Sequence, residues 1–123
     1  MELISLNKDF TISKLKVADN ININQVFTFF SKTDEEISLV CETKYVPEDA
    51  LEVEHGWKCF KISGVLDFGL VGIIAKISSV LAKNNISVFV VSTYNTDYIF
   101  VKEETYNKVT LILSENGYRI VNV

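Results

Sequence analysis

The residues best suited to chemistry begin with a glycine-containing segment, residues 64–72. Here Asp67 and Gly69 precede an apolar pattern of helical period that starts at Leu70, and Gly72 lies in its first turn. Unpaired backbone N–H groups at a helix N-terminus attract a carboxylate, and glycine has no Cβ to obstruct its approach. The segment is therefore a candidate seat for an anion. Taken alone, Asp67 is more readily explained as a helix cap.

A second polar segment, residues 92–98, follows an apolar run and reads Ser-Thr-Tyr-Asn-Thr-Asp-Tyr. Its hydroxyl, amide and carboxylate groups could bind an ammonium group. Asn95 and Asp97 could equally serve only to form a turn, and the two tyrosines could be ordinary cross-strand aromatics. The two segments together make a site for a zwitterion a hypothesis that needs further support.

Other reactive residue types are sparse. Cys41 and Cys59 have neither CxxC spacing nor several histidines nearby, so we expect two buried strand residues rather than a metal site or a redox pair. His55 stands alone in a loop-like stretch, without a recognisable nucleophile. We therefore expect no catalytic activity, no metal and no cofactor.

Composition narrows the class of protein further. The 123 residues suit one compact domain, and the net charge of −4 is spread over mixed charges without a basic stripe. Nucleic acid is therefore an unexpected partner. The chain has no basic leader and no run of roughly 20 apolar residues, so we expect a cytoplasmic protein that does not enter a membrane.

The C-terminal half has the clearer secondary-structure pattern. Helix 103–114 should direct Val109, Ile112 and Leu113 inward, and Gly117 should end it. The expected elements in chain order are strand 57–65, helix 70–83, strand 86–92, strand 98–101, helix 103–114 and strand 118–123. This βαββαβ order predicts an α+β, ferredoxin-like fold, with an antiparallel sheet covered by helices on one face.

The N-terminal half reads as three strands, at residues 10–17, 26–30 and 36–42, with a hairpin turn at 31–35. A short helical turn is expected at Pro47, ended by Gly56. We divide the chain into a β-rich half, residues 1–56, and a complete domain, residues 57–123. Trp57 and Phe89 would lie on the open sheet face, so the N-terminal strands or a partner chain should cover them.

Residues 66–72, 86–89 and 92–98 resemble the ACT-domain subgroup of small bacterial aspartokinase-like regulatory proteins. They are also similar to the ACT repeats of the cytosolic arginine sensor of animals. The resemblance covers residues 57–123 and is weaker over residues 10–42, where the hairpin looks like a shortened ACT half. It implies an ACT domain preceded by a truncated ACT-like N-terminal half.

The resemblance also implies where a ligand binds, because amino acids bind between ACT units in this family. The strand-to-helix loop and the following hairpin line such sites. The corresponding positions here are Asp67, Phe68, Gly69, Leu70, Val71, Phe89, Ser92, Thr93 and Thr96. Lysine-regulated aspartokinases have an acid where this chain has Phe89, so a less cationic ligand, or none, is implied.

Three functions remain open from the sequence. The favoured one is a non-catalytic, allosteric module that binds a free amino acid. It would signal through the packing of ACT units, as a homodimer or through a regulated enzyme in trans. The second is an assembly domain that forms oligomers and has no metabolite ligand. An enzyme is the least supported, because no nucleophile and base pair, metal set or phosphate loop is present.

Overall fold

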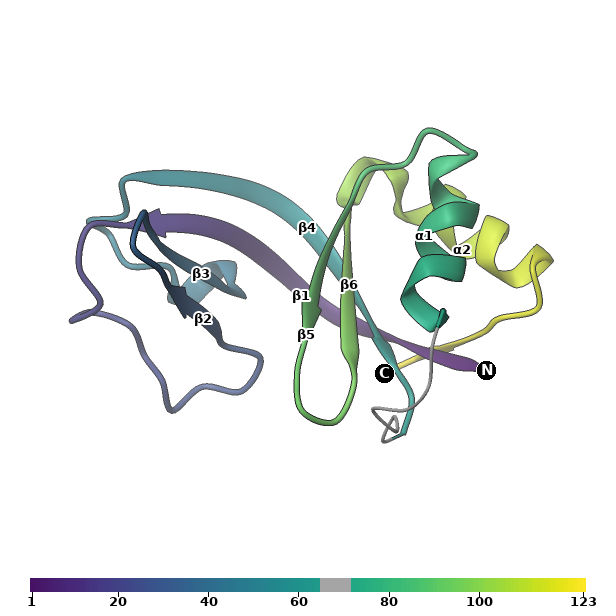
Figure 1. Ribbon diagram of the computed structural model, residues 1–123, viewed down its shortest axis with the longest axis horizontal. Coiled ribbons are helices and arrows are strands. Elements are labelled where there is room, and N and C mark those ends of the chain that lie inside the picture. Colours follow the sequence, from purple (N-terminus) through teal and green to yellow (C-terminus); the bar gives the residue numbers. More distant parts are fainter. Residues whose placement is uncertain (65–71) are drawn as a thin grey trace. The chain divides into compact units, whose positions relative to one another are not determined.

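The computed structural model describes residues 1–64 and 72–123, and the chain forms two compact units (Figure 1). One unit comprises residues 8–57, and the other comprises residues 1–7 with residues 58–123. Two long strands, β1 (Glu2–Leu15) and β4 (Glu52–Ile62), contribute residues to both units. Within the described residues, no helix is long and apolar enough to cross a membrane.

The C-terminal unit has the predicted ferredoxin-like order. After β4 come α1 (Ile73–Ala82), β5 (Val88–Ser92), β6 (Asp97–Lys102), a short 3-10 helix (Glu103–Thr105), α2 (Tyr106–Glu115) and β7 (Arg119–Asn122). β5 pairs antiparallel with β6, and β6 neighbours β4. Figure 1 shows α1 and α2 together on one face of these strands. The predicted α+β class and βαββαβ order are confirmed.

An additional strand enters this sheet from the N-terminus. The first residues of β1 run parallel to β7, with Leu3 opposite Ile120, and β1 is also the neighbour of β4. The sequence predicted a first strand only from Phe10, whereas β1 begins at Glu2. Residues 1–7 therefore belong to the same compact unit as the C-terminal elements.

The core of the C-terminal unit lies between its sheet and its two helices. The predicted inward residues of α2, namely Val109, Ile112 and Leu113, are buried. They pack in one cluster with Ile77 and Leu81 of α1. Each large apolar side chain buried in this way contributes about 1.5 to 3 kcal/mol. This packing holds the sheet ends and loops of the unit in place.

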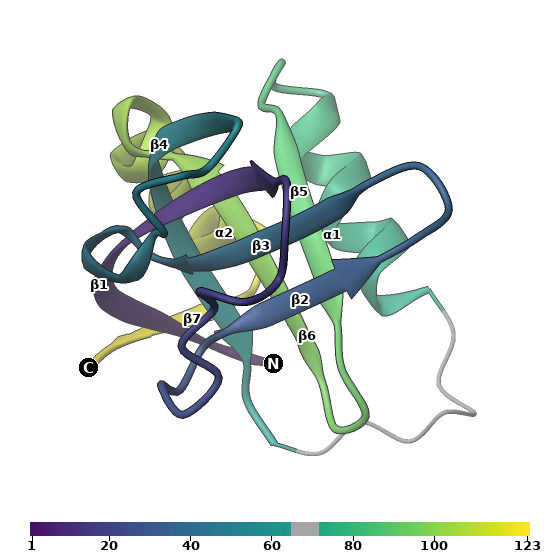
Figure 2. The ribbon, with the colours of Figure 1, turned by 90° about the vertical axis from the view of Figure 1, so that its left-hand side faces the viewer.

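The N-terminal unit contains β2 (Phe29–Lys32), β3 (Ile37–Glu42) and a 3-10 helix (Thr43–Tyr45). The predicted hairpin is present in Figure 2, and the amide of Thr33 donates to the carbonyl of Glu36 at 2.9 Å. β3 also pairs antiparallel with β1. Leu15, Leu39 and Cys41 form a small core in this unit.

Several local predictions for this half were wrong. β2 begins at Phe29 rather than residue 26, because the residues before it turn and Phe27 has a left-handed φ of 58°. Pro47 opens a single hydrogen-bonded turn, in which its carbonyl accepts from the Ala50 amide at 3.2 Å, but no helix follows. Gly56 does not end a helical turn, since it lies inside β4 with a φ of 82°. His55 is therefore a strand residue.

Several boundaries in the C-terminal unit also differ from the prediction; α2, for example, begins at Tyr106 rather than at residue 103. α1 begins at Ile73 rather than Leu70, because Gly72 has a left-handed φ of 81° and serves as the N-cap. β5 begins at Val88, after Asn85 has ended the preceding turn with a φ of 58°. Trp57 is buried within the chain and Phe89 is half-buried.

Candidate functional site

A cavity lies where the β5–β6 turn meets the C-terminal end of β4, and we call it the hairpin pocket. Its volume is about 390 Å³. The residues that line it are Lys61, Gly64, Thr93, Tyr94, Asn95, Thr96 and Tyr98. All of them belong to the C-terminal unit. A cavity of this size suits a small metabolite.

The turn that forms this pocket is held by its own polar side chains. The backbone amide of Thr93 donates to the Thr96 carbonyl at 2.8 Å, and the Thr93 hydroxyl donates to the same oxygen at 2.9 Å. At the base of the hairpin, the Ser92 hydroxyl donates to the Asp97 carboxylate. Short polar side chains that bond to nearby backbone favour turns over continued strand.

Thr96 ties the turn to the neighbouring strand. Its side chain is buried, and its hydroxyl donates to the carbonyl of Ile62 at 2.9 Å. A buried hydroxyl without such a partner would be costly. The bond therefore fixes the position of the hairpin against β4, and with it the wall of the pocket.

Lys61 brings positive charge to the hairpin pocket. Its Nζ lies 5.9 Å from the centre of the Tyr98 ring, within the range of a cation–π interaction. Burial, with a smaller contribution from Cys59, raises the pKa of Tyr98, so its phenol stays neutral. The pocket thus combines one ammonium with hydroxyl and amide groups, a set that can bind a carboxylate.

The predicted site residues are only partly brought together. Thr93 and Thr96 line the hairpin pocket. Ser92 lies at the base of the hairpin and is bonded to Asp97. Phe89 packs edge to face on Phe100 instead, with ring centres 6.2 Å apart. The remaining predicted residues, Asp67, Phe68, Gly69, Leu70 and Val71, lie outside the described residues.

Sequence reasoning missed Lys61. The alternating pattern of its strand placed it only on the polar face, with no indication of a partner. Its aromatic neighbour, Tyr98, comes from a different strand. Pairing between β4 and β6 is the information that joins the two residues, and no local signal supplies it.

A second cavity, of about 310 Å³, lies at the start of α1. Gly72, Ile73 and Lys76 line it from α1, together with Met1, Asn116, Gly117 and Tyr118. Gly72 has no side chain to cap the helix, and its carbonyl accepts the Lys76 amide at 2.9 Å. Gly72 belongs to the segment predicted as the anion seat, and residues 65–71 of that segment lie outside the described part of the chain. Among the predicted site residues that the structure describes, Phe89, Ser92, Thr93 and Thr96 do not line this cavity.

The remaining reactive residue types are engaged in structure. Cys41 and Cys59 are buried free thiols, and burial raises the pKa of both. His55 Nδ1 lies 2.8 Å from the hydroxyl of Thr11, which is fully buried and so unavailable as a nucleophile. Among residues 1–64 and 72–123, no group of three or more His, Cys, Asp or Glu could hold a metal ion.

The C-terminal unit thus combines a ferredoxin-like sheet, two helices on one face of it and a small polar pocket beside a hairpin. The family model for the ACT domain matches residues 52–115, which is more than half of the chain. The chain therefore belongs to the ACT domain family. ACT domains are regulatory modules for small molecules. No curated protein matches the chain.

Solved structures share this fold. Protein Atu0741 from Agrobacterium tumefaciens is 31% identical, with a TM-score of 0.87, over 99% of this chain and 92% of that one. VC0802 from Vibrio cholerae, described as a protein of unknown function and possible transport protein, is 23% identical with a TM-score of 0.73. That match covers 90% of this chain and 85% of that one.

Aspartate kinases share the fold at lower identity. The enzyme from Clostridium acetobutylicum is 16% identical with a TM-score of 0.61. The match covers 88% of this chain but only 33% of the kinase chain. The resemblance to aspartokinase regulatory domains is therefore confirmed at the level of the fold.

Proposed function

We propose that this chain is a non-catalytic amino-acid sensor that binds its ligand in the hairpin pocket. Binding would alter how ACT units pack in a homodimer, or how the chain contacts a separate regulated enzyme. A cytoplasmic location is part of this proposal. The observation that carries it is the position of Lys61, whose ammonium lies over Tyr98 beside the polar hairpin turn.

The ligand carboxylate would pair with the Lys61 ammonium. Charge-assisted hydrogen bonds are about twice as strong as neutral ones, so one such contact can orient the ligand. The ligand ammonium would bind to oxygen atoms of Thr93 and Asn95, which line the same pocket. The family resemblance implies that the ligand of the proposed complex also contacts Asp67, Phe68, Gly69, Leu70 and Val71.

The charge of the pocket restricts the class of amino acid. Lys61 would repel a ligand with a cationic side chain, because like charges within a few ångströms destabilise each other. Phe89 also argues against a cationic ligand, because lysine-regulated aspartokinases have an acidic residue at this position. We therefore expect an amino acid with a neutral or acidic side chain.

The test is calorimetric titration of the full chain with each standard amino acid, accompanied by mass measurement in solution. We expect saturable binding of one amino acid or a few related ones. Lys61→Met should weaken that binding about tenfold, the effect of losing one hydrogen bond to a charged group. Lys14→Met is the matched control, because Lys14 is an exposed strand lysine in the other unit.

Two outcomes would contradict the proposal. Saturable binding that is unchanged in Lys61→Met would place the ligand elsewhere on the chain. A stable oligomer that binds no amino acid would support an assembly domain instead.

A further inference from the structure

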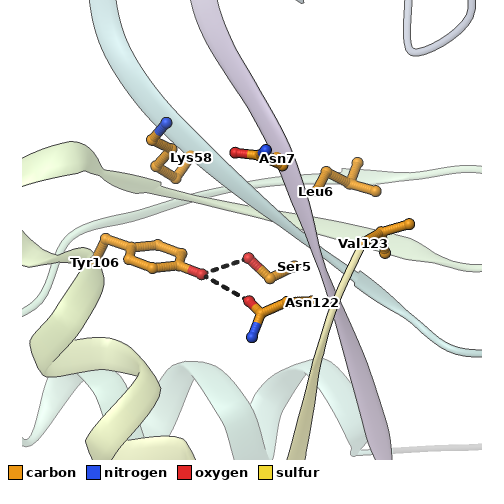
Figure 3. A pocket seen from close by; sticks show the side chains of 7 residues that line it. All are labelled: Ser5, Leu6, Asn7, Lys58, Tyr106, Asn122 and Val123. Carbon is orange, nitrogen blue, oxygen red and sulfur yellow. Dashed lines mark hydrogen bonds between the residues drawn. The ribbon is translucent and has the colours of Figure 1, made fainter.

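A separate cavity, which we call the Tyr106 pocket, lies among β1, β4, α2 and β7 (Figure 3). Its volume is about 290 Å³, near the lower end of the range for small-ligand pockets. Ser5, Leu6, Asn7, Lys58, Tyr106, Asn122 and Val123 line it. It shares no lining residue with the hairpin pocket.

Tyr106 is fixed in this pocket from both ends. Its ring stacks on Phe60, with ring centres 5.4 Å apart and an angle of 5° between the planes. Its hydroxyl lies 2.5 Å from the hydroxyl of Ser5, which is buried, and 3.5 Å from Oδ1 of Asn122. The phenol is therefore positioned before any ligand binds, which lowers the entropic cost of binding.

The paired hydroxyls of Ser5 and Tyr106 leave one hydrogen without a short bond. Each hydroxyl carries one hydrogen, and their mutual contact uses only one of the two. For a Tyr106 hydrogen the available acceptor is Asn122, and 3.5 Å is beyond the usual O–H···O range. An acceptor inside the cavity can form a better bond.

Lys58 and Asn7 also line this cavity. Figure 3 shows Lys58 and Asn7 on one side, and Tyr106, Ser5 and Asn122 on the other. The Lys58 ammonium points away from Tyr106 in this view, and Lys58 already has a contact in the structure, so binding an anion would require its flexible stem to turn.

We propose that the Tyr106 pocket is a second binding site, independent of the hairpin pocket, for a small oxyanion such as a carboxylate or phosphate group. The hydroxyl pair would donate its one spare hydrogen to the anion, and Lys58 would neutralise the anion's charge. The contrasting explanation is that the hydroxyl pair serves only to hold α2, β1 and β7 together.

NMR titration of the full chain separates these explanations. ¹H–¹⁵N spectra are recorded with sodium acetate and, separately, with sodium phosphate, at an ionic strength held constant with sodium chloride. Saturable shifts at the amides of Ser5 and Asn7 and at the Asn122 side chain would support the site. A response to acetate alone assigns a carboxylate, and a response to phosphate alone assigns phosphate.

Tyr106→Phe keeps the ring on Phe60 and removes the hydroxyl, so it should weaken binding about tenfold. Lys58→Gln should weaken binding by a similar factor. It keeps the hydroxyl pair intact, so it still tests the site if Tyr106→Phe does not fold. Tyr45→Phe, in the other unit, is the control and should not change the affinity.

The proposal would be overturned by shifts that do not saturate with either anion. It would also be overturned by equal affinities in the wild type, Tyr106→Phe and Lys58→Gln. Because Lys61→Met leaves this pocket intact, failure at the hairpin pocket and failure here are distinguishable.

Discussion

The hydroxyl of Thr96 donates a hydrogen bond of 2.9 Å to the carbonyl of Ile62, and both residues are buried. Thr96 belongs to the β5–β6 turn, whereas Ile62 is the last residue of β4. This single bond fixes the wall of the hairpin pocket to the sheet. Its loss should affect both the stability of the chain and the shape of the pocket.

Thr96→Val tests this bond with a side chain of nearly the same shape. We expect the free energy of unfolding to fall by about 1 to 2 kcal/mol, because the Ile62 carbonyl loses a buried partner. Urea unfolding followed by circular dichroism measures the change. Thr110→Val removes an exposed hydroxyl on α2 and should change stability by less than about 0.5 kcal/mol. Equal losses in the two variants would contradict the structural role of Thr96.

Local chemistry explains which parts of the site could be predicted from sequence. Thr93 and Thr96 were found because polar turn residues follow an apolar strand, a pattern contained in a few neighbouring positions. Lys61 was missed because its position beside Tyr98 depends on which strands become neighbours. The Tyr106–Ser5 contact was missed for the same reason, since it joins opposite ends of the chain.

The elements of the fold also fall into those that the local sequence predicts and those that depend on distant residues. The inward face of α2 and its end at Gly117 follow from helical periodicity and a glycine with a φ of 90°. The start of β1 at Glu2 did not follow, because that segment is stabilised by parallel pairing with β7 at the other end of the chain. Gly56 resembled a terminator, yet it is accommodated inside β4.

Gly117 provides a test of backbone conformation alone. Its φ is 90°, and an added Cβ would meet no atom within 4 Å, so only the left-handed conformation opposes a larger residue. Gly117→Ala should therefore lower the free energy of unfolding by about 1 to 2 kcal/mol. Asn85→Gly is the matched comparison, because Asn85 already has a φ of 58° and glycine relieves that conformation. The prediction would be contradicted if Asn85→Gly lowered the free energy of unfolding and Gly117→Ala left it unchanged.

The buried thiols should make stability depend on alkaline pH. Burial, with a smaller contribution from Glu42, raises the pKa of Cys41 from 9.0 to about 11, and burial also raises that of Cys59. Above pH 9 the unfolded chain releases thiol protons that the folded chain retains, so folding becomes less favourable. For Cys41 the contribution is complete below pH 9 and is lost as the pH rises through about 11. For Cys59 the loss also begins above pH 9, and each thiol contributes at most roughly 1.4 kcal/mol per pH unit.

Urea unfolding of the wild type, Cys41→Ala and Cys59→Ala at pH 7, 9 and 10 measures this effect. Each variant should lose stability less steeply above pH 9 than the wild type, whatever its stability at pH 7. Cys41→Ala gives the cleaner comparison, because Cys59 also contributes to the raised pKa of Tyr98 and Cys59→Ala therefore changes that titration as well. Parallel curves would show that neither thiol changes its pKa on folding.

The contact between Lys61 and Tyr98 leads to a prediction about ligand affinity. The aromatic ring, and not its hydroxyl, holds the ammonium in this contact. Tyr98→Phe should therefore keep the amino-acid affinity within about twofold, whereas Tyr98→Leu should weaken it about threefold to tenfold, the loss expected for a partly exposed cation–π pair. Calorimetric titration of both variants with the amino acid that binds the wild type gives the comparison. If Tyr98→Phe loses as much affinity as Tyr98→Leu, the phenol itself contacts the ligand and Lys61 does not depend on the ring.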